Sequence, residues 1–331
     1  MSLDPALVAV CFGIGVIVGL TGMGGGALMT PVLVLFFNIP PLTAVSSDLV
    51  ASAMMKPVGA AVHLRHGTVN LRLAAWLCVG SVPAAFSGVF VIRALGDGEQ
   101  VEELTRMALG VALLIAAGGL ILKAYVRLVE RARRRRAEGP PRTADRPEVV
   151  VRILPTVIVG AIGGLVVGMT SVGSGSLIII ALMALYPMLR ANSLVGTDLV
   201  QAVPLVMSAA LAHILYGDFE LALTASLLVG SIPGVWIGAQ LSSRAPGGLV
   251  RRALAFVLLA SALKLLDVPT NTTGVILLIS LFAAPLLWMA VRRLHGLPAF
   301  GRRPPGAHGT DDASASGEPG AVHAPPGTPG T

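Results

Sequence analysis

Two apolar runs in this chain are too long to cross a membrane once. They cover residues 6–37 and 153–187, and as straight helices they would be roughly 48 and 52 Å long, against a hydrocarbon core of roughly 30 Å. Each run is interrupted near its middle by small residues, at Gly22–Gly26 in the first and at Ser171–Ser176 in the second. The pattern predicts two broken helices buried in a bilayer.

The remainder of the chain indicates further membrane crossings. Of its 331 residues, 54% are hydrophobic and only 12% are charged, whereas soluble domains are about 25% charged. This composition excludes an ordinary soluble enzyme, and we expect an all-α polytopic membrane protein. The other apolar runs lie at residues 43–62, 73–92, 104–122, 193–214, 221–241, 252–267 and 274–291.

The distribution of basic residues predicts the orientation in the membrane. Ten of the 24 Lys and Arg residues lie between Lys123 and Arg152, so the net charge of +7 is a local feature and does not indicate nucleic-acid binding. With this segment in the cytoplasm, the later arginine clusters are cytoplasmic only if the 153–187 run returns to the side from which it started. We therefore expect a re-entrant hairpin or a pair of crossings there.

An internal repeat relates the two halves of the chain. The matched pairs, at a shift of 149 and then 150 residues, include Gly19 with Gly168, Gly26 with Gly175, Asp48 with Asp198, His63 with His213, Gly80 with Gly230, and Pro83 with Pro233. If each half holds a hairpin and three crossings, the halves insert with opposite orientation. That arrangement is the inverted repeat of many secondary transporters.

These patterns predict five segments in a multi-pass membrane protein. The segments are a first transmembrane repeat at 1–124, a basic cytoplasmic linker at 125–152, a second transmembrane repeat at 153–267, an additional transmembrane helix at 268–293, and a disordered cytoplasmic tail at 294–331. The tail is expected to be disordered because it consists mainly of Gly, Pro, Ala and Ser with scattered charges.

The two breaks are the expected binding site. A helix that starts at mid-membrane exposes backbone N–H groups, glycine lets a ligand approach them, and hydroxyls add hydrogen bonds. With no carboxylate in either loop, the paired ends suit a small oxyanion. The alternative is that the small residues only permit close helix packing. The candidate substrate-binding residues are Thr21, Gly22, Gly24, Gly25, Gly26, Lys56, Thr170, Ser171, Gly173, Ser174, Gly175 and Ser176.

Ionisable residues within the spans are candidates for proton or ion coupling. They are Asp48, Asp198, His63 and His213. Carboxylates in membrane segments are costly and usually functional, but each aspartate could instead stabilise its own helix end. Each histidine could carry a proton near neutral pH or simply mark the membrane interface. Lys56, where the repeat has Val206, could attract the anion or reach toward the cytoplasmic edge.

No cofactor or metal site is predicted. Cys11 and Cys78 lie inside apolar runs and have neither a metal-binding nor a disulfide spacing. Residues 22–27 have the spelling of a dinucleotide-binding fingerprint without the βαβ unit that it needs. A membrane-embedded enzyme would need a nucleophile with a base, or metal ligands, and the spans offer only distant histidines and aspartates. We therefore expect that the protein is not an enzyme.

Several motifs resemble those of the TauE/SafE family of sulfite-exporter-like membrane permeases. The motifs are the glycine-rich stretch from Gly15 to Gly26 followed by Pro31, the Ser-Ser-Asp and Gly-Thr-Asp starts of the second helices, and Gly-Ser-x-Pro-x-x-x-x-Gly in both halves. The resemblance covers about residues 6–291. It implies a bacterial-type plasma-membrane carrier of about eight helices that moves sulfite, sulfonates or other sulfur-containing or organic anions, commonly outward.

The second loop departs from the pattern of this family. Serines stand in place of glycines at positions 171, 174 and 176, and Ile180 stands where the first repeat has Pro31. These departures concern the substrate and the symmetry of the site.

The sequence patterns favour a secondary transporter working by alternating access, and the resemblance implies that its substrate is a small sulfur-containing or organic anion. The expected partners are that anion, the lipid bilayer, and anionic lipid at the basic run Arg131–Arg136. An anion channel on the same scaffold and a membrane sensor or scaffold without transport are the alternatives.

Overall fold

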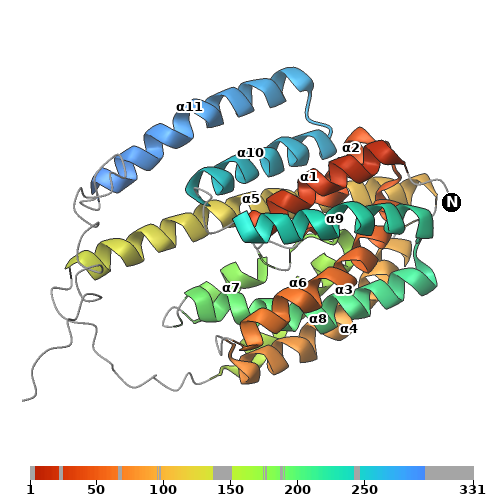
Figure 1. Ribbon diagram of the computed structural model, residues 1–331, viewed down its shortest axis with the longest axis horizontal. Helices are drawn as coiled ribbons and strands as arrows, with labels where there is room; N and C mark the ends of the chain where they lie inside the picture. Colours follow the sequence, from red (N-terminus) through yellow and green to blue (C-terminus); the bar gives the residue numbers. More distant parts are fainter. Residues whose placement is uncertain are drawn as a thin grey trace, which may run out of the picture.

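The protein is a bundle of α-helices (Figure 1). The computed structural model describes residues 4–21, 25–65, 69–94, 96, 98–136, 151–173, 175, 177–186, 189, 191–241 and 247–294. These residues form eleven helices and no strand, which confirms the all-α prediction. The helices are α1 (Pro5–Thr21), α2 (Gly26–Phe36), α3 (Pro41–Arg65), α4 (Leu71–Ala94), α5 (Glu99–Arg136), α6 (Ile153–Thr170), α7 (Leu177–Leu185), α8 (Ala191–Tyr216), α9 (Leu221–Leu241), α10 (Gly247–Leu265) and α11 (Thr270–Leu294).

Both overlong apolar runs are broken where the sequence predicts. α1 ends at Thr21 and α2 begins at Gly26, while α6 ends at Thr170 and α7 begins at Leu177. α2 has 11 residues and α7 has 9, which makes them about 17 and about 14 Å long, and neither could cross about 30 Å of hydrocarbon. Each run is therefore a long helix followed by a short one that stays within the bundle.

α1 packs along α9, a helix of the second half of the chain. Carbonyl oxygens of α1 face glycines of α9 so closely that a Cβ on any of these glycines would collide with backbone. The facing pairs are Val8 with Gly230, Phe12 with Gly234, and Val16 with Gly238. Because the residue numbers rise together, the two helices run parallel. Glycines at such spacing allow this approach, as in Gly-x-x-x-Gly pairs of membrane helices.

α6 packs in the same manner along α4, a helix of the first half. Here carbonyl oxygens of α4 face glycines of α6. The facing pairs are Leu77 with Gly160, Ser81 with Gly164, and Ala85 with Gly168. These two helices also run parallel. The broken helix of each half thus lies against an unbroken helix of the other half.

Two ion pairs define one end of the bundle. Arg93 of α4 pairs with Asp218 just before α9 at 3.1 Å, and Arg106 of α5 pairs with Asp267 just after α10 at 2.5 Å. We call this end of the bundle the acidic end and the opposite end the basic end. α9 starts at the acidic end, so its parallel partner α1 starts there too. α4 finishes at the acidic end, so its parallel partner α6 starts at the basic end.

The second broken run returns to the end at which it began. Tyr186 follows the last residue of α7, and its phenol oxygen accepts a hydrogen bond from the backbone amide of Arg152, directly before α6, at 2.9 Å. In the first run, the residues after α2 line a hollow at the acidic end together with Glu99 and Asp267. The charge pattern predicted this return for the 153–187 run.

The opposite directions of α1 and α6 agree with an inverted repeat. Two hydrogen bonds follow the same relationship. The backbone amide of Glu220 donates to Ser47 Oγ at 3.4 Å, and the backbone amide of Asn70 donates to Thr197 Oγ1 at 3.0 Å. Both the donors and the acceptors are 150 positions apart in the sequence. The inverted repeat stays a prediction, and these contacts support it.

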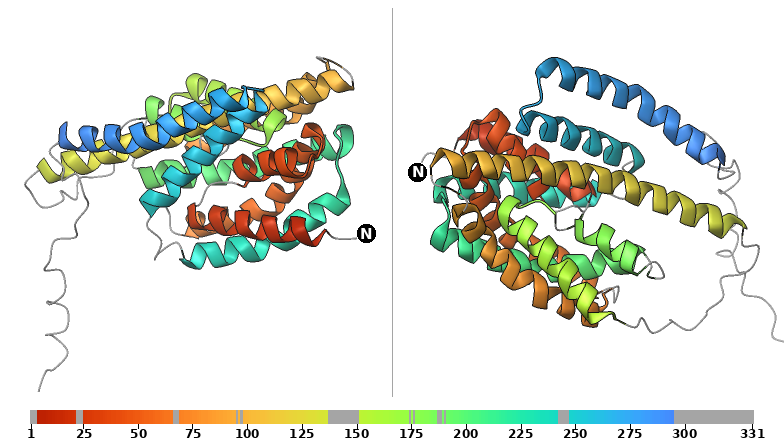
Figure 2. Two further views of the ribbon diagram at one scale, coloured as in Figure 1. Left: turned by 90° about the horizontal axis from the view of Figure 1, so that it is seen from above. Right: turned by 180° about the vertical axis from the view of Figure 1, so that it is seen from behind.

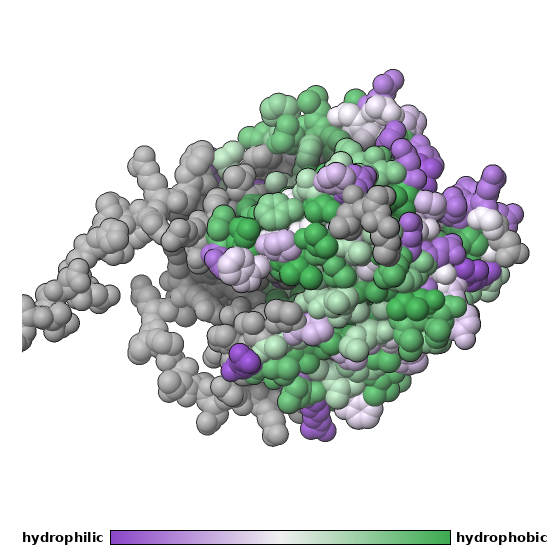
Figure 3. All heavy atoms as spheres, turned by 45° about the vertical axis from the view of Figure 1, so that its right-hand side comes forward, coloured by the Kyte–Doolittle hydropathy of each residue, from purple (hydrophilic) through white to green (hydrophobic). Residues whose placement is uncertain are grey.

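The outer surface of the bundle suits a bilayer. Six helical segments are long and apolar enough to cross a membrane, as counted in the described part of the chain. They are α4, residues 99–126 of α5, α6, residues 193–216 of α8, α9, and residues 270–290 of α11. Figure 3 shows hydrophobic residues across the middle of one face and hydrophilic residues gathered toward one edge.

Two helices add features at the periphery. α5 continues as a helix to Arg136, so the first part of the expected basic linker prolongs this helix. α11 lies at the edge of the bundle, with α10 between it and α5 (Figures 1 and 2). Its large apolar side chains are exposed, for example Phe282 at 64% and Leu287 at 68%, as expected for a helix that faces lipid.

Candidate functional site

The two breaks meet inside the bundle. Gly26, the first residue of α2, packs against Ser171, the residue that follows α6. A Cβ on Gly26 would collide with the Ser171 carbonyl oxygen, and it would lie 2.7 Å from Ser171 Oγ and 2.9 Å from an oxygen of Asp48. Only glycine fits this close approach. The pairing expected between Gly22–Gly26 and Ser171–Ser176 is therefore a direct contact at these two residues.

Asp48 of α3 ties the two breaks together. Its side chain is completely buried, and Oδ2 accepts hydrogen bonds from Thr30 Oγ1 at 3.0 Å and from Ser171 Oγ at 2.6 Å. Thr30 belongs to the first turns of α2, and Ser171 belongs to the second break. One carboxylate thus holds a residue from each half of the chain. The sequence showed that neither loop carries a carboxylate, but folding brings this one to the junction.

The chain reverses after α6 through residues that adopt left-handed backbone conformations. Ser171 has φ of 57°, Gly173 of 130° and Gly175 of 102°. Glycine takes such values without steric cost. A left-handed conformation is sterically unfavourable for Ser171, and the hydrogen bond from its hydroxyl to Asp48 offsets this cost. The Ser171 amide donates to the Val167 carbonyl oxygen at 2.7 Å, which ends α6 in a manner typical of a left-handed cap.

Asp198 of α8 is the residue that matches Asp48 in the internal repeat, and it lies beside the second break. It is completely buried, and the backbone amide of Gly175 is directed at its carboxylate. Gln201 Nε2 donates to Asp198 Oδ1 at 3.3 Å, and Ser81 Oγ of α4 donates to Gln201 Oε1 at 3.0 Å. A chain of hydrogen bonds therefore connects the second aspartate to the Gly-Ser-x-Pro motif of the first half.

Three buried polar atoms near the junction have no hydrogen-bond partner among the described residues. They are Asp48 Oδ1, Ser52 Oγ and Asp198 Oδ2. Native proteins leave few buried polar atoms unsatisfied, because each one costs free energy. Their presence beside the contact of the two breaks is the arrangement expected of a site that binds a polar ligand.

Two lysines, Lys56 and Lys123, lie within electrostatic range of the buried aspartates. Lys56, only 8% exposed, interacts electrostatically with both Asp48 and Asp198. Lys123 of α5 interacts with Asp198 as well. Lys56 lies two turns beyond Asp48 on the same face of α3, with Ser52 between them. Placed in this way, Lys56 points to the interior of the bundle and not to the membrane edge.

The predicted site residues take up different positions. Gly25, Gly26, Ser171, Gly173, Gly175 and Lys56 lie at or beside the junction. The hydroxyls of Thr21 and Thr170 donate to carbonyl oxygens of their own helices, at Ile17 and Val166. The predicted binding residues Gly22, Gly24, Ser174 and Ser176 lie outside the described residues, as does the side chain of His63.

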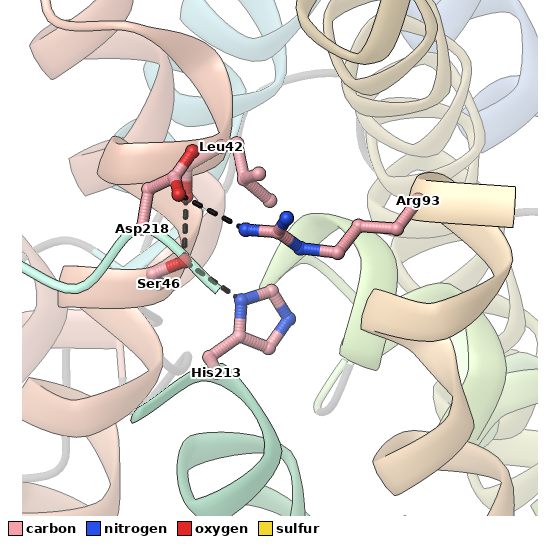
Figure 4. Close-up of polar contacts among 5 residues, drawn as sticks. All are labelled: Leu42, Ser46, Arg93, His213 and Asp218. Atoms are coloured by element: carbon pink, nitrogen blue, oxygen red, sulfur yellow. Dashed lines mark hydrogen bonds and ion pairs between the residues drawn. The ribbon is translucent and has the colours of Figure 1, made fainter. Parts of the chain in front are cut away.

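His213 occupies a separate polar cluster nearer the acidic end (Figure 4). Its ring is completely buried, with Nε2 2.7 Å from the Gly168 carbonyl oxygen and Nδ1 2.8 Å from Ser46 Oγ. Because a carbonyl only accepts, Nε2 carries a hydrogen. Ser46 Oγ also lies 2.7 Å from the Leu42 carbonyl oxygen, so its single hydrogen can serve either acceptor. The histidine joins α8 to α3 and to the end of α6.

Some residues of the junction were missed in the sequence. Thr30 sits in an apolar stretch of α2, and no sequence signal marks it. Ser52 could have been found, because it is four residues from Asp48 and four from Lys56, which places all three on one helical face. Lys123 was counted among the basic residues of the cytoplasmic segment, whereas the structure brings it within electrostatic range of Asp198.

Comparisons with known proteins agree with this architecture. The family profile named "Sulfite exporter TauE/SafE" matches residues 7–265. No solved structure matches the chain.

Relatives from two bacteria carry transporter names. The chain is 38% identical to Bacillus subtilis (strain 168) YjnA over 254 residues, which are 76% of this chain and 96% of the relative. It is 27% identical to YdhB of the same strain over 248 residues, which are 75% of this chain and 94% of the relative. A Xylella fastidiosa (strain 9a5c) protein is 26% identical over 269 residues, 80% of this chain and 95% of the relative. All three are described as probable membrane transporter proteins, and the chain belongs to the sulfite exporter TauE/SafE family of membrane transporters.

Proposed function

We propose that this membrane transporter carries a small sulfur-containing or organic oxyanion, with sulfite and sulfonates as the first candidates, by alternating access. The observation that carries the proposal is the contact between Gly26 and Ser171, which joins the two breaks inside the bundle. The family name supports the choice of sulfite as a candidate.

The donors around the junction suit an oxyanion. The start of α2 offers backbone N–H groups and the positive end of a helix dipole, and Gly25 and Gly26 are buried there and carry no side chain. Ser171 adds a hydroxyl and Lys56 adds an ammonium group. Amides, hydroxyls and ammonium groups together can bind the several oxygens of a sulfite or sulfonate.

The directions of the short helices support alternating access. α2 leads from the junction to the acidic end, and α7 leads from the second break to the basic end. A ligand between the breaks would therefore be next to a short helix that leads to each end of the bundle. Discontinuous helices of this kind form the binding sites of many secondary transporters.

We propose that the basic end faces the cytoplasm of a cell with this protein in its plasma membrane. Exposed arginines of the basic end include Arg65, Arg72 and Arg152. The loop residues of the acidic end include Asp218, Glu220 and Asp267. The positive-inside rule places the basic loops in the cytoplasm.

Counterflow in proteoliposomes tests the transport function. Vesicles loaded with unlabelled sulfite, sulfoacetate, thiosulfate or sulfate would be placed in the same labelled anion at low concentration. A carrier accumulates the label transiently, whereas a channel gives currents too fast for a carrier cycle. We expect counterflow of at least one of these anions. A thermal unfolding transition would show that the purified protein is folded. If folded protein gives no counterflow with any anion of the panel, the proposal is contradicted.

A glycine pair supplies the matched variants for the site. Gly26→Leu inserts a side chain into the contact between the breaks, and we expect counterflow to fall at least tenfold. Gly13→Leu makes the same change in α1, where a Cβ meets nothing within 4 Å, and we expect counterflow close to that of the unmodified protein. Equal flux through both variants would place the anion away from the junction.

A further inference from the structure

We propose that the oxyanion and a proton bind together, with the proton on the Asp48 carboxyl group. This inference rests on the proposed anion site at the junction of the breaks. It adds that the transporter couples anion movement to proton movement in the same direction, through one residue.

The Asp48 carboxylate occupies donors that the anion needs. Oδ2 takes the hydroxyl hydrogens of Thr30 and Ser171, at 3.0 and 2.6 Å. The same oxygen lies 2.9 Å from the position of a Cβ on Gly26, so it sits at the positive start of α2. An ionised carboxylate has only acceptors, as an oxyanion does. The two groups would therefore compete for the same hydrogens and repel each other.

Protonation turns Asp48 from a competitor into a donor. The carboxylate takes up one proton and no electron moves, so the product is a neutral carboxylic acid with one O–H group. Oδ1 is buried and has no hydrogen-bond partner among the described residues, which makes it the free position for that proton. The acid can then donate to an oxygen of the anion, while the Ser171 and Thr30 hydroxyls are released to do the same.

The charges around Asp48 favour loading the two ions together. Lys56, on the same helix, interacts electrostatically with Asp48 and also with Asp198 of α8, and Lys123 of α5 adds a positive charge near Asp198. From α1, Cys11 lies within electrostatic range of Asp48. The two aspartates and the two lysines cancel one another when all are ionised. Any of the panel anions alone would add net negative charge inside a low-dielectric bundle, whereas a proton bound with the anion removes one unit of that charge.

Asp48 is better placed for this role than the other buried acid. Asp198 accepts a hydrogen bond from Gln201, one turn further along α8, and the backbone amide of Gly175 is directed at its carboxylate. Both partners belong to the same half of the chain as Asp198. Asp48 bonds to Thr30 of α2 in the first half and to Ser171 of the second break. A change in its protonation therefore alters the contact between the two halves, which is the contact that must change when access alternates.

Net uptake and counterflow, measured side by side, test the coupling. The probe is the anion of the panel that gives the strongest counterflow, with a sulfonate preferred because its sulfonate group stays ionised across the neutral range. In the unmodified protein, we expect net uptake into vesicles to rise at least fivefold with an acidic exterior and to be lost with a protonophore. Counterflow without a gradient should remain.

Asp48→Asn and Asp267→Asn are the matched variants. Asn at position 48 keeps the shape and the donor of the protonated acid, so we expect counterflow to persist while net uptake no longer responds to the gradient. Asp267 is an exposed acid of the acidic end with φ of 53°, which Asn tolerates. Asp267→Asn should keep the gradient response of the unmodified protein.

A measurement on the unmodified protein keeps the inference testable if Asp48→Asn does not fold. Adding the anion to purified protein in weakly buffered detergent solution should raise the pH, with about one proton taken up per anion bound at a single site. No proton uptake, or net uptake that ignores the gradient while counterflow is normal, would overturn the coupling and leave the transport function standing. Loss of counterflow for every anion would instead overturn the transport function on which the inference rests.

Discussion

Ser171 donates its hydroxyl hydrogen to Asp48 across 2.6 Å, although the two residues are 123 positions apart in the chain. The bond joins the break of the second half to a helix of the first half. Ser171 also holds a left-handed backbone conformation, so its side chain and its backbone contribute to stability in opposite senses. Variants at this position can separate the two contributions.

Ser171→Ala should lower the free energy of unfolding by about 1–3 kcal/mol, because a hydrogen bond to a buried carboxylate is lost. Ser171→Gly loses the same bond but relieves the left-handed backbone, so it should be about 1 kcal/mol more stable than the alanine variant. Thermal unfolding in detergent would rank the three proteins. Ser87→Ala, which removes only a hydroxyl bonded to Ala84 of its own helix, is the control and should change little. An alanine variant as stable as the glycine variant would contradict the backbone argument.

Gly164→Ala should destabilise the packing of α6 against α4. The added Cβ would collide with the carbonyl oxygen of Ser81, and forcing the helices apart costs about 1–3 kcal/mol. Gly118→Ala in α5 is the matched change, since a Cβ there meets nothing within 4 Å. Chemical or thermal unfolding of both variants measures the difference. If both glycines tolerate alanine equally, the close approach of α4 and α6 is wrong.

Ser81 and Gln201 should be energetically coupled. Gln201→Leu removes the donor to Asp198 and leaves the Ser81 hydroxyl without its acceptor, so we expect a loss of about 1–3 kcal/mol. Ser81→Ala should cost less in the Gln201→Leu background than in the unmodified protein. A double-mutant cycle of unfolding free energies gives the coupling, and we expect about 0.5–1.5 kcal/mol. Additive effects would show that the hydrogen bond contributes nothing.

Cysteine labelling from outside the cell tests the orientation. In a background without Cys11 and Cys78, Glu220→Cys at the acidic end should react with a membrane-impermeant maleimide on intact cells. Arg72→Cys at the basic end should react only after the membrane is permeabilised. The reverse pattern would place the basic end outside and would contradict the positive-inside assignment.

Features encoded by local composition could be predicted from the sequence. The breaks at 22–25 and 171–176 follow from runs that exceed the bilayer thickness and from clustered Gly and Ser residues. The return of α7 to the basic end follows from the distribution of arginines. Asp48 and Asp198 were recognisable because carboxylates are rare in apolar helices.

Features that depend on contacts between distant segments could not be predicted. Nothing local in the sequence shows that α1 packs on α9 or that Gly26 meets Ser171, because such pairing depends on how the whole bundle assembles. For the same reason, the absence of carboxylates from the two loops did not show that the fold brings Asp48 of α3 to the second break. Thr30 looked like one more small residue of an apolar helix until the structure placed it beside this carboxylate.

The glycine seams of α1 with α9 and of α6 with α4 have a consequence for how the protein is assembled in a cell. In the described residues, the glycine-lined face of α9 is covered by α1 and that of α6 is covered by α4, so each seam is made by helices of different halves. A polypeptide cut between Arg136 and Val151 should therefore remain a single noncovalent complex when its fragments are synthesised together. Either fragment made alone would expose a seam to lipid and should be a target for membrane proteolysis.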